Sequence, residues 1–155
     1  MNKKNGNTHK SVSMVDISSK SNVYRTAEAE GAIRLSHQTI DSLRNGTVKK
    51  GNVLATAEVA GIIAAKKTHE LIPLCHSIPI TSVQISFRLK NDGVEASCTV
   101  NANYKTGVEM EALVGVSMAL LTVWDMVKYM EKDDKGQYPT TAIKCIRIVK
   151  KVKKE

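Results

Sequence analysis

The chain has 155 residues, 42% of them hydrophobic and 25% charged, which is ordinary for one globular domain and excludes wholesale disorder, collagen-like repeats and a coiled-coil rod. The net charge of +8 sits mostly at the ends, because seven of the 23 Lys and Arg residues but only one of the 15 Asp and Glu residues lie in segments 1–13 and 150–155. An aromatic content of 4% leaves few platforms on which unpaired bases stack. We therefore expect no nucleic-acid partner.

Cysteine usage and hydropathy favour a reduced compartment and no membrane span. The three cysteines, Cys75, Cys98 and Cys145, are widely spaced and include no Cys-x-x-Cys pair. This pattern is typical of neither a disulfide framework nor a zinc finger. The longest nearly apolar run, 112–124, is too short to cross a bilayer. Segment 1–13 lacks the apolar core of a signal peptide. We expect a cytoplasmic protein.

The first predicted elements are a strand and two helices. Segment 30–36 alternates weakly between apolar and polar residues, which predicts a strand. Ser36 is placed to cap a short helix at 37–44, which Asn45-Gly46 ends. Segment 53–67 is alanine-rich with apolar residues at helical spacing, so it predicts a second helix, and its two final lysines suit a helix C-terminus.

The second half of the chain predicts a loop, a hairpin, a long helix and a last strand. Segment 68–79 contains two prolines and no periodicity, which is typical of a loop. Alternation on both sides of Asn91-Asp92-Gly93 predicts a β-hairpin of strands 81–90 and 94–104. The remaining elements are a helix at 108–132 and a strand at 141–149.

This order of elements is close to the ferredoxin-like βαββαβ pattern. We expect an α+β fold in which an antiparallel sheet carries its helices on one face. The domain is expected at 14–149, between a disordered N-terminal tail at 1–13 and a basic C-terminal tail at 150–155. Such a fold names no function, because it hosts many.

Lysines flank the predicted second helix on both sides. Lys49 and Lys50 precede it, and Lys66 and Lys67 end it. Several cations that converge on one site neutralise a polyphosphate, and Lys50-Gly51 adjoins a helix N-terminus, where anions bind. The alternative is that these are solvated surface lysines. The chain contains no Gly-x-x-x-x-Gly-Lys-[Ser/Thr] motif, which excludes a P-loop.

A second candidate is the Cys75-His76 pair, which lies between two prolines. It offers a nucleophile with its base or half of a metal site, but adjacent side chains rarely face one another and no other Cys or His cluster supplies ligands. We therefore expect no metal site. His76 alone offers an acid, a base or a hydrogen-bond donor to a bound ring. The alternative is a loop in which Cys75 packs as a small apolar residue.

The predicted long helix carries acidic residues near both ends. Thr106 and Glu109 form a capping box, whereas Glu111 is not needed for the cap and adjoins an apolar stretch that should half-bury it. Asp125 and Lys128 share one helical face and are either an exposed ion pair of little worth or a partly buried pair suited to proton transfer. Glu111 and Asp125 are roughly 21 Å apart along the helix, so a small-molecule site that uses both requires two subunits.

Five segments taken together match one family: KGNV at 50–53, AGIIAAKKT at 60–68, LIPLCH at 71–76, KTGVEMEAL at 105–113 and WDMVK at 124–128. They resemble the cyclic pyranopterin monophosphate synthase family, molybdenum cofactor biosynthesis protein C. The resemblance runs from about 15–18 to Arg147, and Gln137-Tyr138-Pro139 resembles the archaeal branch. Many bacterial members carry a Lys-Ser-Gly-Gly-Lys-like loop where this chain reads IKCIRIV at 143–149. Lys144 is therefore not counted among the site residues.

The resemblance implies a ferredoxin-like fold assembled as a hexamer, a trimer of dimers, with active sites at the dimer interface. It implies a lyase that converts (8S)-3',8-cyclo-7,8-dihydroguanosine 5'-triphosphate, a cyclic dihydroguanosine triphosphate, to cyclic pyranopterin monophosphate and pyrophosphate during molybdenum cofactor biosynthesis. No organic cofactor is implied, and Mg²⁺ accompanying the triphosphate is left open.

By this resemblance Lys128 is the proton shuttle and Asp125 its orienter or a base. The cations expected around the triphosphate are Lys50, Lys66, Lys67 and, from elsewhere in the assembly, Arg25. The other residues expected to bind the substrate are Leu74, Cys75, His76, Glu109, Met110 and Glu111, of which His76 and Glu111 hold or protonate the guanine-derived ring.

Two other classes of function stay open. One is a ferredoxin-like RNA-binding module that uses the basic tails, although Phe87 and Tyr104 are the only aromatic residues on the predicted strands. The other is a regulatory oligomer that binds a nucleotide without turning it over.

Overall fold

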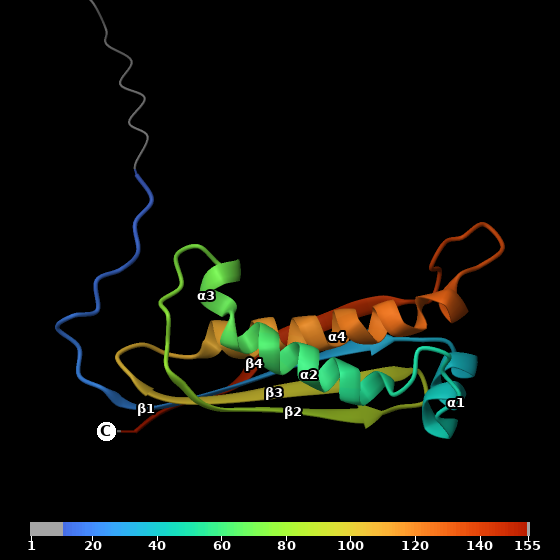
Figure 1. Cartoon of the computed structure of the whole chain (residues 1–155), viewed down its shortest axis with the longest axis horizontal. Coiled ribbons are helices and arrows are strands. Elements are labelled where there is room, and N and C mark those ends of the chain that lie inside the picture. The colour runs from blue at the N-terminus through green and yellow to red at the C-terminus, as the bar shows by residue number, and fades with distance from the viewer. Residues whose placement is uncertain (1–10, 155) are drawn as a thin grey trace, which may run out of the picture.

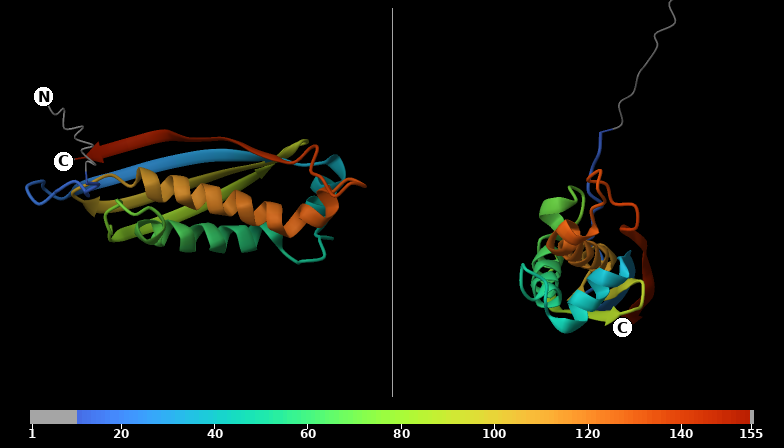
Figure 2. Two further views of the ribbon diagram at one scale, coloured as in Figure 1. Left: turned by 90° about the horizontal axis from the view of Figure 1, so that it is seen from above. Right: turned by 90° about the vertical axis from the view of Figure 1, so that its right-hand side faces the viewer.

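The computed structural model describes residues 11–154, so most of the predicted tail at 1–13 lies outside the described residues. The elements, in chain order, are β1 (Val23–Arg34), α1 (His37–Asn45), α2 (Val53–Lys66), α3 (Thr68–Leu71), β2 (Ile80–Leu89), β3 (Gly93–Tyr104), α4 (Glu109–Glu131) and β4 (Ala142–Lys154). The strands form one antiparallel sheet in the order β2-β3-β1-β4. Helices α2 and α4 lie side by side on one face of this sheet (Figures 1 and 2). The predicted ferredoxin-like α+β fold is confirmed.

The core lies between that sheet and the two helices. Every second residue is buried over 27–33 of β1 and 94–102 of β3, including Ala27, Ala29, Ala96 and Cys98. Helix α4 is long and apolar enough to cross a membrane by length and composition, but half of its most apolar window is buried inside the protein. We interpret α4 as a core helix, because it packs on α2 and on the sheet.

Helices α2 and α4 run antiparallel and lie close together where each has a glycine. A Cβ atom on Gly61 would lie 2.8 Å from the carbonyl oxygen of Gly115 and would also collide with the side chain of Ile85. A Cβ atom on Gly115 would lie 2.6 Å from Sγ of Cys98. These positions require glycine because a neighbouring helix or strand occupies the space of a side chain.

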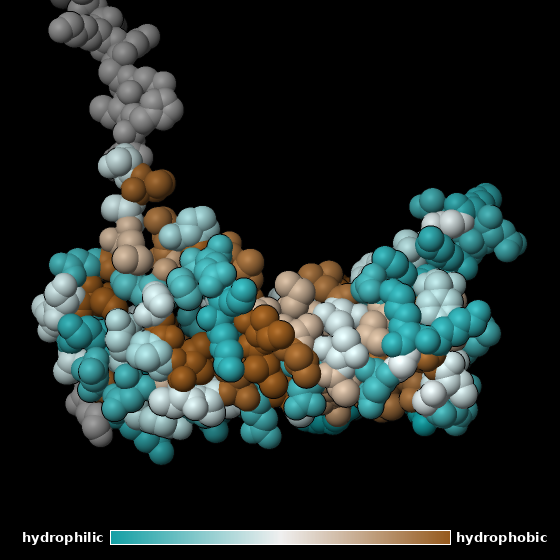
Figure 3. Space-filling model, viewed as in Figure 1, coloured by the Kyte–Doolittle hydropathy of each residue, from teal (hydrophilic) through white to brown (hydrophobic). Residues whose placement is uncertain are grey.

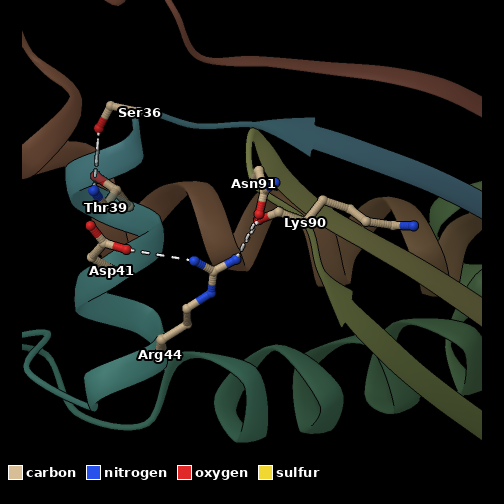
Figure 4. A network of polar contacts seen from close by, with 6 residues as sticks. All are labelled: Ser36, Thr39, Asp41, Arg44, Lys90 and Asn91. Atoms are coloured by element: carbon tan, nitrogen blue, oxygen red, sulfur yellow. Dashed lines mark hydrogen bonds and ion pairs between the residues drawn. The ribbon is translucent and has the colours of Figure 1, made fainter.

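Polar contacts hold both ends of α1. Ser36 caps α1 as predicted, since its Oγ accepts a hydrogen bond from the backbone N–H of Thr39. Arg44 contacts Asp41 on the same helix and donates to Oδ1 of Asn91 in the β2–β3 turn, at 3.1 Å (Figure 4). Helix α1 is thereby held against the end of the sheet.

A buried carboxylate joins α1, α4 and β4. Glu131 is 6% exposed and accepts hydrogen bonds from Ser36 Oγ at 2.8 Å and Thr141 Oγ1 at 2.6 Å. Burial raises the pKa of this carboxyl, but hydrogen bonds from Thr141, Thr39 and Ser36 outweigh burial, so its pKa lies below the ordinary value. The ionised side chain therefore belongs to the folded structure at neutral pH.

Four predictions about local structure were wrong. Strand β1 begins at Val23 instead of residue 30, because its core-facing residues include alanines whose place in the sheet is set by pairing with β3. Strand β4 continues through residues 150–154, which pair with β1 and are not a free tail. The predicted loop at 68–79 contains the short helix α3. The capping box is absent, because α4 begins at Glu109 and its N-cap, Val108, makes no side-chain cap.

We expect Gly61→Ala to destabilise the protein by about 1–3 kcal/mol, because overpacking outweighs the gain of about 1 kcal/mol that alanine brings to an open helix position. Urea unfolding measures this change, and Glu58→Ala, at an exposed position of α2, should alter stability by less than about 0.5 kcal/mol. A Gly61→Ala protein as stable as the wild type would contradict the close contact.

Candidate active site

Two groups of the predicted site residues lie at opposite ends of α4. The lysine–aspartate cluster consists of Lys50, Asp125 and Lys128. The Glu111 pocket is a cavity of about 360 Å³ near the start of α4. Its lining includes Leu74, Cys75, His76, Met110 and Glu111.

The lysine–aspartate cluster joins the turn before α2 to the end of α4. Lys50 Nζ donates to Oδ2 and to the backbone oxygen of Asp125, both at 2.8 Å. Lys128 Nζ lies 2.7 Å from Oδ1 of the same carboxylate, so the predicted pairing of Asp125 with Lys128 is confirmed. All three side chains are about half exposed, and the cluster therefore forms an open surface with two cations around one anion.

The two lysines control the protonation of this cluster. Hydrogen bonds from Lys128 and then Lys50 hold the pKa of Asp125 at about 2. In return, the hydrogen bond and charge of Asp125 raise the pKa of Lys128. Lys128 is therefore an ammonium ion at neutral pH in the single chain, and this charge suits it to bind an anion. Of the two alternatives for Asp125 and Lys128, the single chain shows the exposed ion pair.

The Glu111 pocket combines a buried acid with groups able to hold a ring. Glu111 is 3% exposed, and its Oε2 has no hydrogen-bond partner among the described residues. Burial, and then the charge of Glu109, raise the pKa of this carboxyl. His76 Nε2 lies 2.8 Å from the carbonyl oxygen of Val15 and must donate there, because a carbonyl only accepts. Glu111 was expected to be half-buried and is almost completely buried.

Cys75 lines the same pocket as an uncharged thiol. Burial, and then the charge of Glu111, raise its pKa above the ordinary value. A thiol is a poor nucleophile until it ionises, so the Cys75-His76 pair does not form a thiolate site. This arrangement favours the alternative in which Cys75 packs as a small apolar residue.

A basic pocket of about 430 Å³ adjoins the Glu111 pocket and shares Lys20, Thr106, Gly107 and Met110 with it. Its other charged lining residues are Arg25, Lys105, Glu109 and Lys151. Arg25 donates to the backbone oxygens of Tyr104 and Lys105, and Lys151 forms an ion pair with Glu109. The structure therefore places Arg25 and Glu109 beside Glu111, as part of the same end of the molecule.

Three cations of this basic pocket were missed by the sequence prediction. Lys105 opens the KTGVEMEAL motif, and Lys20 follows closely on the start of the family resemblance, so both had a signal nearby. Lys151 had none, because its segment was assigned to a free tail and its position depends on the pairing of β4 with β1.

Lys66 and Lys67 do not converge with Lys50 in one chain. They end α2, and this helix of 14 residues separates them from Lys50 by roughly 21 Å. Lys67 Nζ lies 3.9 Å from a carboxylate oxygen of Glu70, an exposed contact of little energetic worth. Because α2 and α4 are antiparallel, these two lysines lie at the end of the molecule that carries Glu111.

The raised pKa of Glu111 predicts how the stability of the protein changes with pH. Because its folded pKa is raised, the folded chain binds this proton at pH values where the unfolded chain has released it, so stability from this group falls as pH rises above about 4.5. We therefore expect the stability of Glu111→Gln to improve relative to wild type between pH 4 and pH 7, measured by urea unfolding. A difference that is constant with pH would contradict the unpaired buried acid.

Comparison with known proteins assigns the family. Residues 14–154 match the model of the MoaC family. The chain is 60% identical over 146 residues to the probable cyclic pyranopterin monophosphate synthase of Thermococcus onnurineus, covering 94% of each chain. It is 58% identical over 142 residues to that of Archaeoglobus fulgidus, covering 92% of this chain and 91% of the relative. A Methanothermobacter thermautotrophicus relative, named a probable cyclic pyranopterin monophosphate synthase accessory protein, is 58% identical over 146 residues, 94% of this chain and 92% of its own. The chain belongs to the MoaC family.

Proposed function

We propose that this protein is a cyclic pyranopterin monophosphate synthase of molybdenum cofactor biosynthesis. Its substrate is the cyclic dihydroguanosine triphosphate, and its products are cyclic pyranopterin monophosphate and pyrophosphate. The observation that carries the proposal is the lysine–aspartate cluster, which keeps two ammonium groups on one carboxylate where an anionic substrate can reach them. The names of its archaeal relatives, probable cyclic pyranopterin monophosphate synthases, support the same activity.

The cations of the two ends suit the phosphate chemistry. Closing a cyclic ester on the α-phosphorus forms one P–O bond and breaks another, so negative charge develops on the departing pyrophosphate. Ammonium and guanidinium groups held in advance stabilise that charge. We assign this role to Lys50 in one chain, and to Lys66, Lys67 and Arg25 at the opposite end of a neighbouring chain. Mg²⁺ accompanying the triphosphate stays a prediction.

The acidic and basic groups suit the rearrangement of the purine-derived ring, which requires protons to be moved between nitrogen and oxygen atoms. Lys128 begins as an ammonium ion and so acts first as a donor, while Asp125 orients it. Glu111, whose raised pKa eases its protonation, and His76 hold the ring in the apolar pocket.

The complete site is proposed to need two chains. One α4 helix places Glu111 and Asp125 roughly 21 Å apart, which is too far for one small substrate to contact both. Apolar side chains on the helical layer, Val59 and Ile63 of α2 and Leu121 of α4, are at least half exposed. Figure 3 shows apolar surface over this layer. A second copy that covers such surface would bring opposite ends together, and a hexamer as a trimer of dimers is the assembly we propose.

The alternative of an RNA-binding module loses the support of its C-terminal tail. Residues 150–154 pair with β1 in the sheet, so they are not a basic tail free to wrap a nucleic acid. Phe87 is partly buried against the hydrophobic core, so only part of its ring is open to a stacking base. We propose a cytoplasmic enzyme that acts on a small molecule.

A single-turnover assay tests the proposed function and the role of Lys128. Enzymatically made cyclic dihydroguanosine triphosphate is mixed with the protein, and pyrophosphate and the fluorescence of the oxidised pterin are followed. We expect Lys128→Ala to lower the rate by about 10²-fold or more, as loss of a proton-transfer group does. Lys50→Ala should mainly raise KM.

The matched control is Lys132→Ala, which removes an exposed lysine one turn beyond Lys128 and should leave the rate unchanged. A folded, oligomeric wild type that forms no product would contradict the proposed function and favour the binding-only alternative. A Lys128→Ala protein with the wild-type rate would instead contradict the role of this lysine.

A further inference from the structure

The turn that carries Lys50 has little structure of its own to aim that side chain. It connects α1 to α2 and contains Gly51, whose φ of 95° reverses the chain, and whose N–H donates to the oxygen of Val48 at 3.0 Å. Val48 is buried, but Lys49 and Lys50 are exposed. A lysine side chain with four rotatable bonds loses much conformational freedom when it is fixed, so Lys50 needs its backbone held in place.

Tyr129 supplies the missing attachment from α4. Its hydroxyl oxygen accepts a hydrogen bond from the backbone N–H of Lys49 at 2.9 Å. The Nζ atom of Lys49 also lies 5.9 Å from the centre of the Tyr129 ring, within the range of a cation–π contact. Both contacts involve the residue immediately before Lys50.

The spacing of residues on α4 places Tyr129 next to Asp125. Tyr129 follows Asp125 by four residues, so the two side chains are neighbours on one helical face. Asp125 receives the side chain of Lys50 at 2.8 Å, and Tyr129 receives the backbone of Lys49. Two consecutive residues of the turn are thus held by two adjacent positions of the helix.

We propose that Tyr129 is a positioning residue for the reaction: its hydroxyl holds the Lys49–Lys50 turn against α4 so that Lys50 Nζ stays beside Asp125. This inference rests on the proposed function, because Lys50 is taken to bind the substrate phosphates. Tyr129 is 39% exposed, so its hydroxyl contributes to the placement of Lys50 more than to the core.

The test is Tyr129→Phe, which keeps the ring and removes the hydroxyl. We expect kcat/KM to fall about fivefold, the size that loss of one ordinary hydrogen bond gives, with most of the change in KM. Tyr24→Phe is the matched control, since Tyr24 is 43% exposed and its hydroxyl bonds Asn101, far from this turn. That variant should keep the wild-type kcat/KM.

A double-mutant cycle with Lys50→Ala separates positioning from a general structural effect. If Tyr129 acts through Lys50, adding Tyr129→Phe to Lys50→Ala lowers kcat/KM no further. The same fivefold loss in both backgrounds would overturn the inference, as would unchanged kcat/KM for Tyr129→Phe alone.

Amide hydrogen exchange at Lys49 checks the contact without any substrate. We expect exchange at this amide to be several-fold faster in Tyr129→Phe than in the wild type, because the amide loses its only described acceptor. Unchanged exchange would overturn the inference. A wild type that makes no product would count against the proposed function, and the exchange rate would then decide the positioning role by itself.

Discussion

The close antiparallel contact between α2 and α4 determines where the candidate groups of these two helices lie. Gly61 and Gly115 let the two helices approach until only backbone and small side chains separate them. The beginning of α2 is thereby brought to the end of α4, which places Lys50 on Asp125. The same contact carries Lys66 to the opposite end, where α4 begins. A different crossing of these helices would separate Lys50 from Asp125.

The two ends of α4 have opposite electrostatic characters. At the C-terminal end, exposed lysines depress the pKa of Asp125 and keep it ionised. At the N-terminal end, burial raises the pKa of Glu111 and eases its protonation. One end thus offers exposed cations around an ionised carboxylate, and the other offers a buried acid in a largely apolar pocket. A substrate that is a triphosphate at one side and a guanine-derived ring at the other has the chemistry to use both, which is the physical basis for proposing a site shared by two chains.

Much of this arrangement was predictable from local patterns in the sequence. Helical spacing alone paired Asp125 with Lys128, and an apolar neighbourhood predicted the burial of Glu111. The order of elements was sufficient to predict the sheet. What failed depends on partners distant in the chain: Lys151 reaches Glu109 only because β4 pairs with β1 to its end. The contact of Tyr129 with the backbone of Lys49 had no local signal either, because it joins segments 80 residues apart.

The central claim, a site assembled from two chains, is tested most directly by mixing two inactive variants. Glu111→Gln removes the acid from one half-site, and Lys128→Ala removes the proton donor from the other. If the halves come from different chains, co-expression in equal amounts creates mixed dimers with one intact site each, and about a quarter of the wild-type activity returns. If the site lies within a single chain, every site in the mixture stays defective, and activity no greater than that of the separate variants would contradict the account.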